Sequence, residues 1–479
     1  MTPVLRLSAL AAAALLTACA VPLTPDAEDA LPRPGPFQHA DTLAAAAGGA
    51  PGWDVFGDPR LDELLREGLQ ANLDLRQAAE RVRRAQALAD GARAASRPAV
   101  HFGADFRDEQ ASAHQAPGLP DADARRRESA SAAVTWSWEL DLFGRLAAGR
   151  AAAAERAAAS QADADALRLS VAGRIAHTWF ALEGAREQRR IAIEVLANRR
   201  ATRDLVAHRL RAGAATALDE ARARADLAAA EAELPALDAE VGAVTHRLAV
   251  LLGRSPSGYV APASADRPLR PVALTLPDPQ AWAAARPDLR AAEATLRAQR
   301  LDVQAVRAEF LPRVSITGAL GLVAGSLSGL GAVGSTAWFI APALGGPVFD
   351  GGRIEARLQS ARAGQREAML AYHQRLLLAT EEVETALARV GRDQARVAAW
   401  MDGAAQAQRA QRLARERFAA GASDLLELLD AQRQAHLAQR HLASAVTEHR
   451  QRLADLQRAL GRGPDPTAGV AGATSTAGG

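Results

Sequence analysis

The sequence has few aromatic residues, a single cysteine and no lysine, and each shortage excludes something. Aromatic residues make up 4% of the 479 positions, although 49% of the chain is hydrophobic. A chain with so few bulky side chains is poorly suited to one deep globular core and favours long helices packed through small residues. The single cysteine excludes an intramolecular disulfide.

The absence of lysine also narrows the possible functions. All 57 basic residues are arginine, and 55 acidic residues are interleaved with them, giving a formal net charge of +2. This balance does not form the basic patch of a nucleic-acid-binding protein, so no nucleic-acid partner is expected. The sequence Gly329-Leu-Gly-Ala-Val-Gly334 fits a dinucleotide-binding pattern by letter but lacks the strand–helix context. We predict no catalytic, cofactor-binding or metal-binding residues and therefore no enzyme.

The N-terminus has the pattern of a secretory signal peptide, which we assign to residues 1–18. Arg6 precedes an apolar run that is too short to span a membrane. The tetrapeptide Leu16-Thr-Ala-Cys19 resembles a bacterial lipobox, which predicts lipidation at Cys19; the alternative is an ordinary signal peptide with an incidental cysteine. Ala20 stands where an aspartate would signal inner-membrane retention, so we expect sorting to the outer membrane. Residues 19–52, rich in Ala, Pro and Gly, are expected to form a lipidated extended arm.

Two similar stretches, Arg209–Asp219 and Arg417–Glu427, indicate an internal repeat. Each is a short break centred on a glycine, Gly213 or Gly421, between two long helical runs, so each predicts the tip of a helical hairpin. The two glycines are 208 positions apart (421 − 213). We assign residues 53–254 to the first repeat, 255–279 to an irregular linker, 280–462 to the second repeat and 463–479 to a disordered tail.

The first repeat predicts a helix, a β-hairpin and a long helical hairpin, in that order. A helical run from Asp58-Pro59 is expected to continue to about Ser96, and another from Gly144 to Gly213 spans roughly 100 Å at 1.5 Å per residue. Pro235 should kink or break the returning helix. Between these runs, apolar and polar residues alternate on both sides of an expected loop at 107–128, which predicts the β-hairpin. In the second repeat, Pro342 makes the fourth strand of the chain less clear.

The strand count constrains the assembly. Alternating strands suit a soluble sandwich or a membrane barrel, and the signal peptide and the long helices favour the barrel. Each repeat supplies two strands, and four strands cannot close a barrel without leaving unpaired edges in lipid. Three copies would supply twelve strands. We therefore expect a membrane α+β protein: a trimeric 12-stranded transmembrane β-barrel continued by a long periplasmic α-helical barrel. The count does not require this solution uniquely.

The chain resembles the TolC-like outer-membrane factors, specifically NodT-type lipoprotein channels of tripartite efflux systems. The motifs that carry the resemblance run through the mature chain in a fixed order: Trp53…Phe56-Gly-Asp-Pro-Arg-Leu61, Asn72-Leu-Asp-Leu75, Trp138-Glu-Leu-Asp-Leu-Phe-Gly-Arg145, Arg286-Pro-Asp-Leu289, Phe310-Leu-Pro-Arg313, Pro347-Val-Phe-Asp-Gly-Gly-Arg353 and Leu429-Asp-Ala-Gln-Arg433. The resemblance implies a homotrimer in the bacterial outer membrane, in contact with its lipid. It also implies a periplasmic adaptor (a membrane fusion protein) and an inner-membrane pump of the RND type.

The resemblance also implies functional residues at the helix tips. Leu426, Asp430 and Arg433 match residues that narrow the periplasmic end in efflux members, and their spacing places them on one helix face. The position equivalent to Asp430 in the first repeat is Arg222, so the two hairpins cannot contribute identically to a constriction. The alternative is a surface pair between Asp430 and Arg433. The residues expected to dock the adaptor are Arg209, Gly213, Leu218, Arg417 and Gly421.

Three functions follow as hypotheses. The first is a passive efflux channel for drugs or other toxic small molecules, gated at the periplasmic tips. The second is the outer-membrane channel of a type I protein secretion system. The third is a structural lipoprotein that bridges the periplasm by a coiled coil; the four alternating strands argue against it.

Overall fold

The structure is a computed structural model that describes residues 31–39, 52–115, 118, 121, 123–263 and 276–464. From Pro34 onward the chain forms one compact unit. The predicted signal peptide, Cys19 and residues 465–479 of the predicted tail lie outside the described residues. Within the described part of the chain, no helix combines the length and the hydropathy needed to cross a lipid bilayer.

The first repeat contains the expected helices, with two corrections. Its helical elements are η3 (Gly52–Phe56), α2 (Pro59–Ala71), α3 (Leu73–Ala94), the short η4 (Asp123–Arg125), α4 (Arg145–Arg211) and α5 (Ala217–Leu251). The prediction of one unbroken run from Pro59 to about Ser96 is wrong, because Asn72 ends α2 and caps α3. Pro235 does not break α5. It is exposed there, so water can solvate the carbonyl that lacks a helical partner.

The second repeat reproduces these elements in register. It comprises α6 (Pro279–Ala285), α7 (Pro287–Arg307), η5 (Ala308–Phe310), η6 (Leu327–Gly329), α8 (Arg353–Ala419) and α9 (Leu425–Ala459). Helices α4 and α8 both have 67 residues, and α5 and α9 both have 35. Their first residues lie 208 positions apart (353 − 145 and 425 − 217). The repeat seen in the sequence is therefore a repeat in three dimensions.

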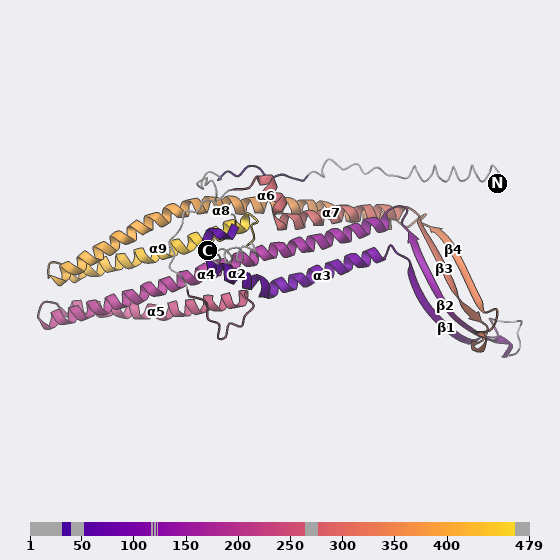
Figure 1. The fold of residues 1–479 in the computed structure, drawn as a ribbon, viewed down its shortest axis with the longest axis horizontal. Helices are drawn as coiled ribbons and strands as arrows, with labels where there is room; N and C mark the ends of the chain where they lie inside the picture. Colours follow the sequence, from indigo (N-terminus) through magenta and orange to yellow (C-terminus); the bar gives the residue numbers. More distant parts are fainter. Residues whose placement is uncertain are drawn as a thin grey trace, which may run out of the picture. The chain divides into compact units, whose positions relative to one another are not determined.

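The long helices lie side by side in two sets. Toward the strands the packing order is α3–α4–α7–α8, and toward the hairpin tips it is α5–α4–α9–α8. Helices α4 and α8 run through both sets because of their length (Figure 1). Each set is an open row: α3 and α5 end it on one side, and α8 ends it on the other.

The strands β1 (Ala99–Gln110), β2 (Arg126–Leu140), β3 (Arg313–Ala324) and β4 (Thr336–Gly345) form one antiparallel sheet in chain order. The first hairpin pairs Ala99 with Ser137 and the second pairs Arg313 with Gly345, so the offset is 214 on one strand (313 − 99) and 208 on the other (345 − 137). The second hairpin is therefore six residues shorter than the first (214 − 208), and the difference falls in the turn. Strands β1 and β2 extend into the loop expected at 107–128, because pairing continues to Gln110 opposite Arg126.

One face of the sheet is apolar across all four strands. Phe102 lies opposite Val134, Val134 opposite Leu320, and Leu320 opposite Trp338. Directly opposed residues share a face, so this row confirms the predicted apolar side. Phe102 and Trp338 are 75% and 72% exposed in the single chain. An apolar surface of this kind marks a contact with lipid or with another protein.

Pro342 does not prevent β4 from forming, because β4 is at an edge of the sheet. It lies opposite Ile316 within a continuous ladder. Proline lacks an N–H and is tolerated on edge strands, where that group would point away from the sheet. In the described chain, β1 and β4 each pair on one side only.

Where the two repeats begin, one side chain in each binds the end of the returning helix. In the first repeat, the buried Asn72 Nδ2 donates to the Leu251 carbonyl at 2.8 Å. In the second, Arg286 Nη1 donates to the Ala459 carbonyl at 2.9 Å. These pairs match by the same two offsets, 214 (286 − 72) and 208 (459 − 251). The motifs Asn72-Leu-Asp-Leu75 and Arg286-Pro-Asp-Leu289 are thus junctions that fix the hairpins to α3 and α7.

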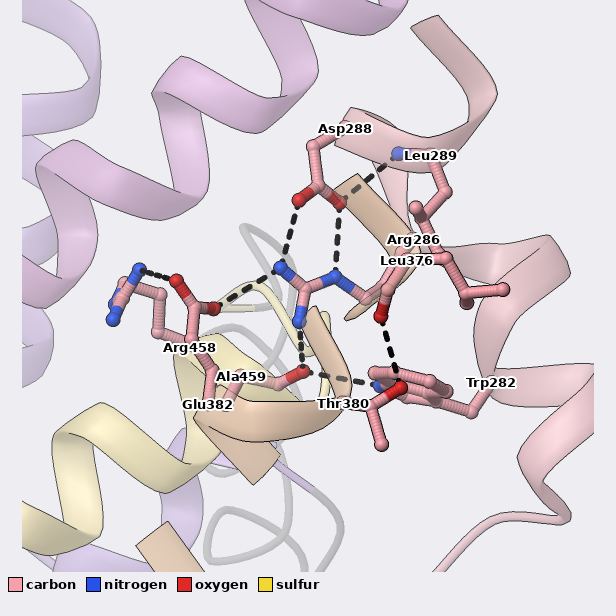
Figure 2. Close-up of polar contacts among 9 residues, drawn as sticks. All are labelled: Trp282, Arg286, Asp288, Leu289, Leu376, Thr380, Glu382, Arg458 and Ala459. Carbon is pink, nitrogen blue, oxygen red and sulfur yellow. Dashed lines mark hydrogen bonds and ion pairs between the residues drawn. The ribbon is translucent and has the colours of Figure 1, made fainter. Parts of the chain in front are cut away.

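Figure 2 shows the second junction, which is more polar than the first. The guanidinium of Arg286, which is 6% exposed, binds both carboxylate oxygens of Asp288 at 2.9 and 2.7 Å and reaches Glu382 at 3.1 Å. Trp282 Nε1 donates to the same Ala459 carbonyl at 3.0 Å. Burial favours the neutral form of Asp288, but the hydrogen bonds and charge of Arg286 outweigh it and lower the pKa of that carboxyl.

Part of the predicted extended arm is held against the second repeat. Glu384 on α8 accepts hydrogen bonds from the backbone N–H groups of Gln38 and His39, at 2.6 and 3.2 Å, and its carboxylate lies 2.7 Å from His39 Nδ1. The Phe37 ring packs edge-on against Trp282. In this stretch the arm is a bound segment rather than a free spacer.

Candidate functional site: the helix tips and the gate

Both hairpin tips end their incoming helices with the same hydrogen bonds. Ala214 N donates to the Arg209 carbonyl and Ala422 N to the Arg417 carbonyl, each at 2.8 Å. This bonding requires a left-handed residue after the helix, which is why Gly213 (φ 73°) and Gly421 (φ 75°) occupy it. The role of the two glycines is therefore to end a helix, and any contribution to docking comes in addition.

The returning helices begin with side-chain caps. The Thr216 hydroxyl accepts from Asp219 N, and the Asp219 carboxylate accepts from Thr216 N, which together form a capping box at the start of α5. Asp424 accepts from Glu427 N at the start of α9. These caps make the tips short and well defined, and so place Leu218 and Leu426 on the outside, 57% and 59% exposed.

The two tip arginines, equivalent by sequence, have different partners. Arg209 Nη1 donates to the Phe418 carbonyl at 2.7 Å, and its guanidinium lies 4.5 Å from the centre of the Phe418 ring. Arg417 instead bonds within its own hairpin, to the Ala422 carbonyl and, at 3.3 Å, to Glu427. Arg209 therefore joins the first tip to the second. The two arginines therefore have different contacts in the single chain, and their role in docking an adaptor stays a prediction.

The candidate gate residues lie near the beginning of α9. Arg433 Nη2 contacts Asp430 Oδ1 at 2.5 Å, and both side chains are more than half exposed. An exposed i,i+3 pair contributes roughly 0–1 kcal/mol to stability. The pair is therefore not needed to hold the chain together, and its exposed position leaves it available to other copies.

A buried polar network next to the gate was not foreseen from the sequence. Arg199 on α4, 9% exposed, donates to Gln432 Oε1 at 2.6 Å, and Gln432 Nε2 donates to Thr202 Oγ1 at 2.9 Å. Asp226 on α5 lies 3.2 Å from the Arg199 guanidinium. Burial lowers the pKa of Arg199, with Asp226 acting in the opposite direction. Three helices contribute to this network, so no local motif could reveal it.

His449 on α9 provides a prediction about pH. It is 3% exposed, its Nδ1 has no hydrogen-bond partner among the described residues, and burial lowers its pKa below the usual 6.5. Because the unfolded chain then binds a proton more readily than the folded one, stability should fall as the pH drops below about 6.5. His449→Leu should flatten this fall in the thermal unfolding midpoint between pH 7.5 and 5.

The control for this prediction is the exposed His373 on α8. His373→Gln should leave the pH dependence as it is in the natural chain. An equal acid-induced loss in the His449→Leu protein would show that other groups cause it.

Comparison with known proteins relates this architecture to outer-membrane channels. The family model for "Outer membrane efflux protein" matches residues 64–254 and 279–462. The pyoverdine export outer membrane protein OpmQ of Pseudomonas putida is 33% identical over 452 residues, which cover 94% of this chain and 95% of that protein. Nodulation protein T of Rhizobium leguminosarum bv. trifolii is 30% identical, covering 87% of this chain and 88% of that protein.

A solved structure agrees with the sequence comparison. The outer-membrane channel OprN superimposes with a TM-score of 0.84 at 32% identity, covering 93% of this chain and 100% of that chain. The predictions of fold class and of outer-membrane location are confirmed. The function is transport through a channel and not catalysis. The chain belongs to the outer membrane efflux protein family.

Proposed function

We propose that three copies of this chain close into one passive conduit that exports small molecules across the periplasm and the outer membrane. One observation carries the proposal: the unpaired edges of the sheet and the open ends of the two helix rows lie on the same two sides of the chain. Strand β1 and helices α3 and α5 end the rows on one side, whereas β4 and α8 end them on the other. If the β4 and α8 edge of one copy meets the β1, α3 and α5 edge of the next, every row closes at once.

The helices at the two open edges carry exposed apolar side chains, which a contact between copies would bury. On α8, Leu370 and Leu377 are 68% and 56% exposed, and on α3, Leu73 and Leu88 are 59% and 68% exposed. Leu370 and Leu377 are seven residues apart and so lie on one face of α8. Contact between copies would remove these side chains from water, at about 25 cal/mol for each Å² buried.

The remaining parts of the proposal concern the lipid and the partners. Cys19 carries the lipid anchor, the apolar face of the sheet contacts outer-membrane lipid, and the exposed tips dock a periplasmic adaptor fed by an inner-membrane pump of the RND type. Leu426, Asp430 and Arg433 of the three copies surround the periplasmic opening. Two relatives are named for the export of pyoverdine and of toluene, and this favours small molecules over the secreted proteins of a type I system as cargo.

The test uses the full-length protein extracted in detergent. Light scattering should give the mass of three chains, and planar bilayers should show ion conductance. A monomer without conductance would overturn the proposal. Deletion of the gene should raise sensitivity to small toxic compounds and leave protein secretion intact, whereas the reverse result would favour type I secretion.

A further inference from the structure

The contact that Arg209 makes with the second tip has no equivalent from Arg417 within the single chain. The offset of 208 relates Arg209 to Arg417 (417 − 209), Phe418 to Leu210 (418 − 210) and Gly421 to Gly213. Within one chain, Arg209 binds the second tip at the Phe418 carbonyl. The equivalent contact, from Arg417 to a Leu210 carbonyl, does not occur in the single chain, because Arg417 bonds to its own hairpin.

The acceptor side of this counterpart is open. The Phe418 carbonyl accepts from the backbone N–H groups of Ala420 and Gly421 and also from Arg209. In the described chain, the Leu210 carbonyl has only the two equivalent backbone donors, Ala212 N and Gly213 N. Because the Phe418 carbonyl accepts an arginine in addition to its two backbone donors, the Leu210 carbonyl can do the same. The space beside Gly213 is open as well. A Cβ at Gly421 would meet Arg209 at 3.8 Å, while one at Gly213 would meet nothing within 4 Å.

We propose that in the assembled channel Arg417 of each copy donates to the Leu210 carbonyl of the next copy, closing the ring of six tips. The proposal rests on the proposed trimer. The ion pair of Arg417 with Glu427 does not oppose it. Asp219 is the equivalent of Glu427 (427 − 208) and lies near enough for the charge of Arg209 to act on its carboxylate, yet Arg209 reaches the other hairpin.

The contact between copies differs from the one within a copy. Leu210 offers no aromatic ring, so the cation–π part of the Arg209 contact has no equivalent. At the positions that correspond to Arg199 and Thr202 stand Ala407 and Ala410. The hydrogen bonds of Arg199 and Thr202 with Gln432 therefore have no equivalent between neighbouring copies.

A pair of cysteine substitutions tests the contact in the full-length protein. Arg417→Cys with Leu210→Cys, treated with a short bis-maleimide, should shift the monomer band on a denaturing gel to dimer and trimer bands. The matched pair, Arg209→Cys with Phe418→Cys, should cross-link within one chain and remain at the monomer position. The natural chain, with Cys19 alone, gives the background.

The outcomes separate this inference from the proposed trimer. Light scattering of the untreated double variant reports the assembly. A trimer in which the Arg417 and Leu210 cysteines give only monomer bands would overturn the inference alone, whereas a monomer would overturn the proposed function. If the double variant does not fold, Arg417→Ala should raise the conductance of the resting channel, and Arg415→Ala, at a neighbouring exposed position, should not. Equal conductance for Arg417→Ala and the natural chain would also overturn the inference.

Discussion

Arg286→Ala is expected to destabilise the chain by about 3–5 kcal/mol, the typical cost of removing one partner from a buried ion pair. The substitution leaves the Asp288 carboxylate without its two short hydrogen bonds and removes a donor from the Ala459 carbonyl. It also opens the contact between the start of α7 and the end of α9. The measurement is the midpoint of unfolding in guanidinium chloride, followed by circular dichroism of the detergent-solubilised protein.

Two further variants distinguish geometry from charge. Arg286→Lys keeps the charge but cannot bind Asp288 through two parallel bonds, so its loss should be intermediate. Arg297→Ala removes an arginine that is 43% exposed and paired with Glu155 and Glu293, and its cost should stay within about 1 kcal/mol. Equal losses for Arg286→Ala and Arg297→Ala would contradict the importance given to the buried junction.

Asp430→Ala is expected to raise the conductance of the resting channel several-fold and to increase antibiotic leakage into cells. In the proposed trimer, three Asp430 carboxylates surround the opening and hold Arg433, so their removal widens the opening and weakens cation selectivity. The substitution should not unfold the chain, because the pair is exposed. Single-channel recording in planar bilayers measures both quantities.

The internal repeat supplies the matched control for this gate. Arg222 occupies the position equivalent to Asp430 in the first hairpin (430 − 208). Arg222→Ala should leave the conductance and the selectivity unchanged. An unchanged conductance in Asp430→Ala, or an equal rise in both variants, would contradict the assignment of Asp430 to the gate.

Much of the fold could be predicted because its signals are local and long. The glycine tips, the two uninterrupted 67-residue helices and the alternating strands each leave a pattern in consecutive residues. The break at Asn72 was missed because its cause is distant: the side chain binds the Leu251 carbonyl, 179 residues away. The break considered at Pro235 does not occur, since an exposed helix tolerates one missing backbone hydrogen bond.

The site was less accessible to sequence reasoning. The positions of Asp430 and Arg433 on one exposed helix face could be predicted, and the structure shows them paired. The different partners of Arg209 and Arg417 could not, because their flanking residues are nearly the same. The network around Arg199 depends on three helices meeting at one level, which only tertiary packing determines.

The six residues missing between β3 and β4 indicate where the chain can accommodate foreign sequence. The helical hairpins of the two repeats have the same spacing, and a single inserted residue would rotate every later side chain by about 100° around its helix. The turn between the strands has changed length without disturbing the register on either side. A peptide epitope inserted between Ser326 and Ser335 should therefore be tolerated. Labelling of intact cells with an antibody against the epitope would measure this.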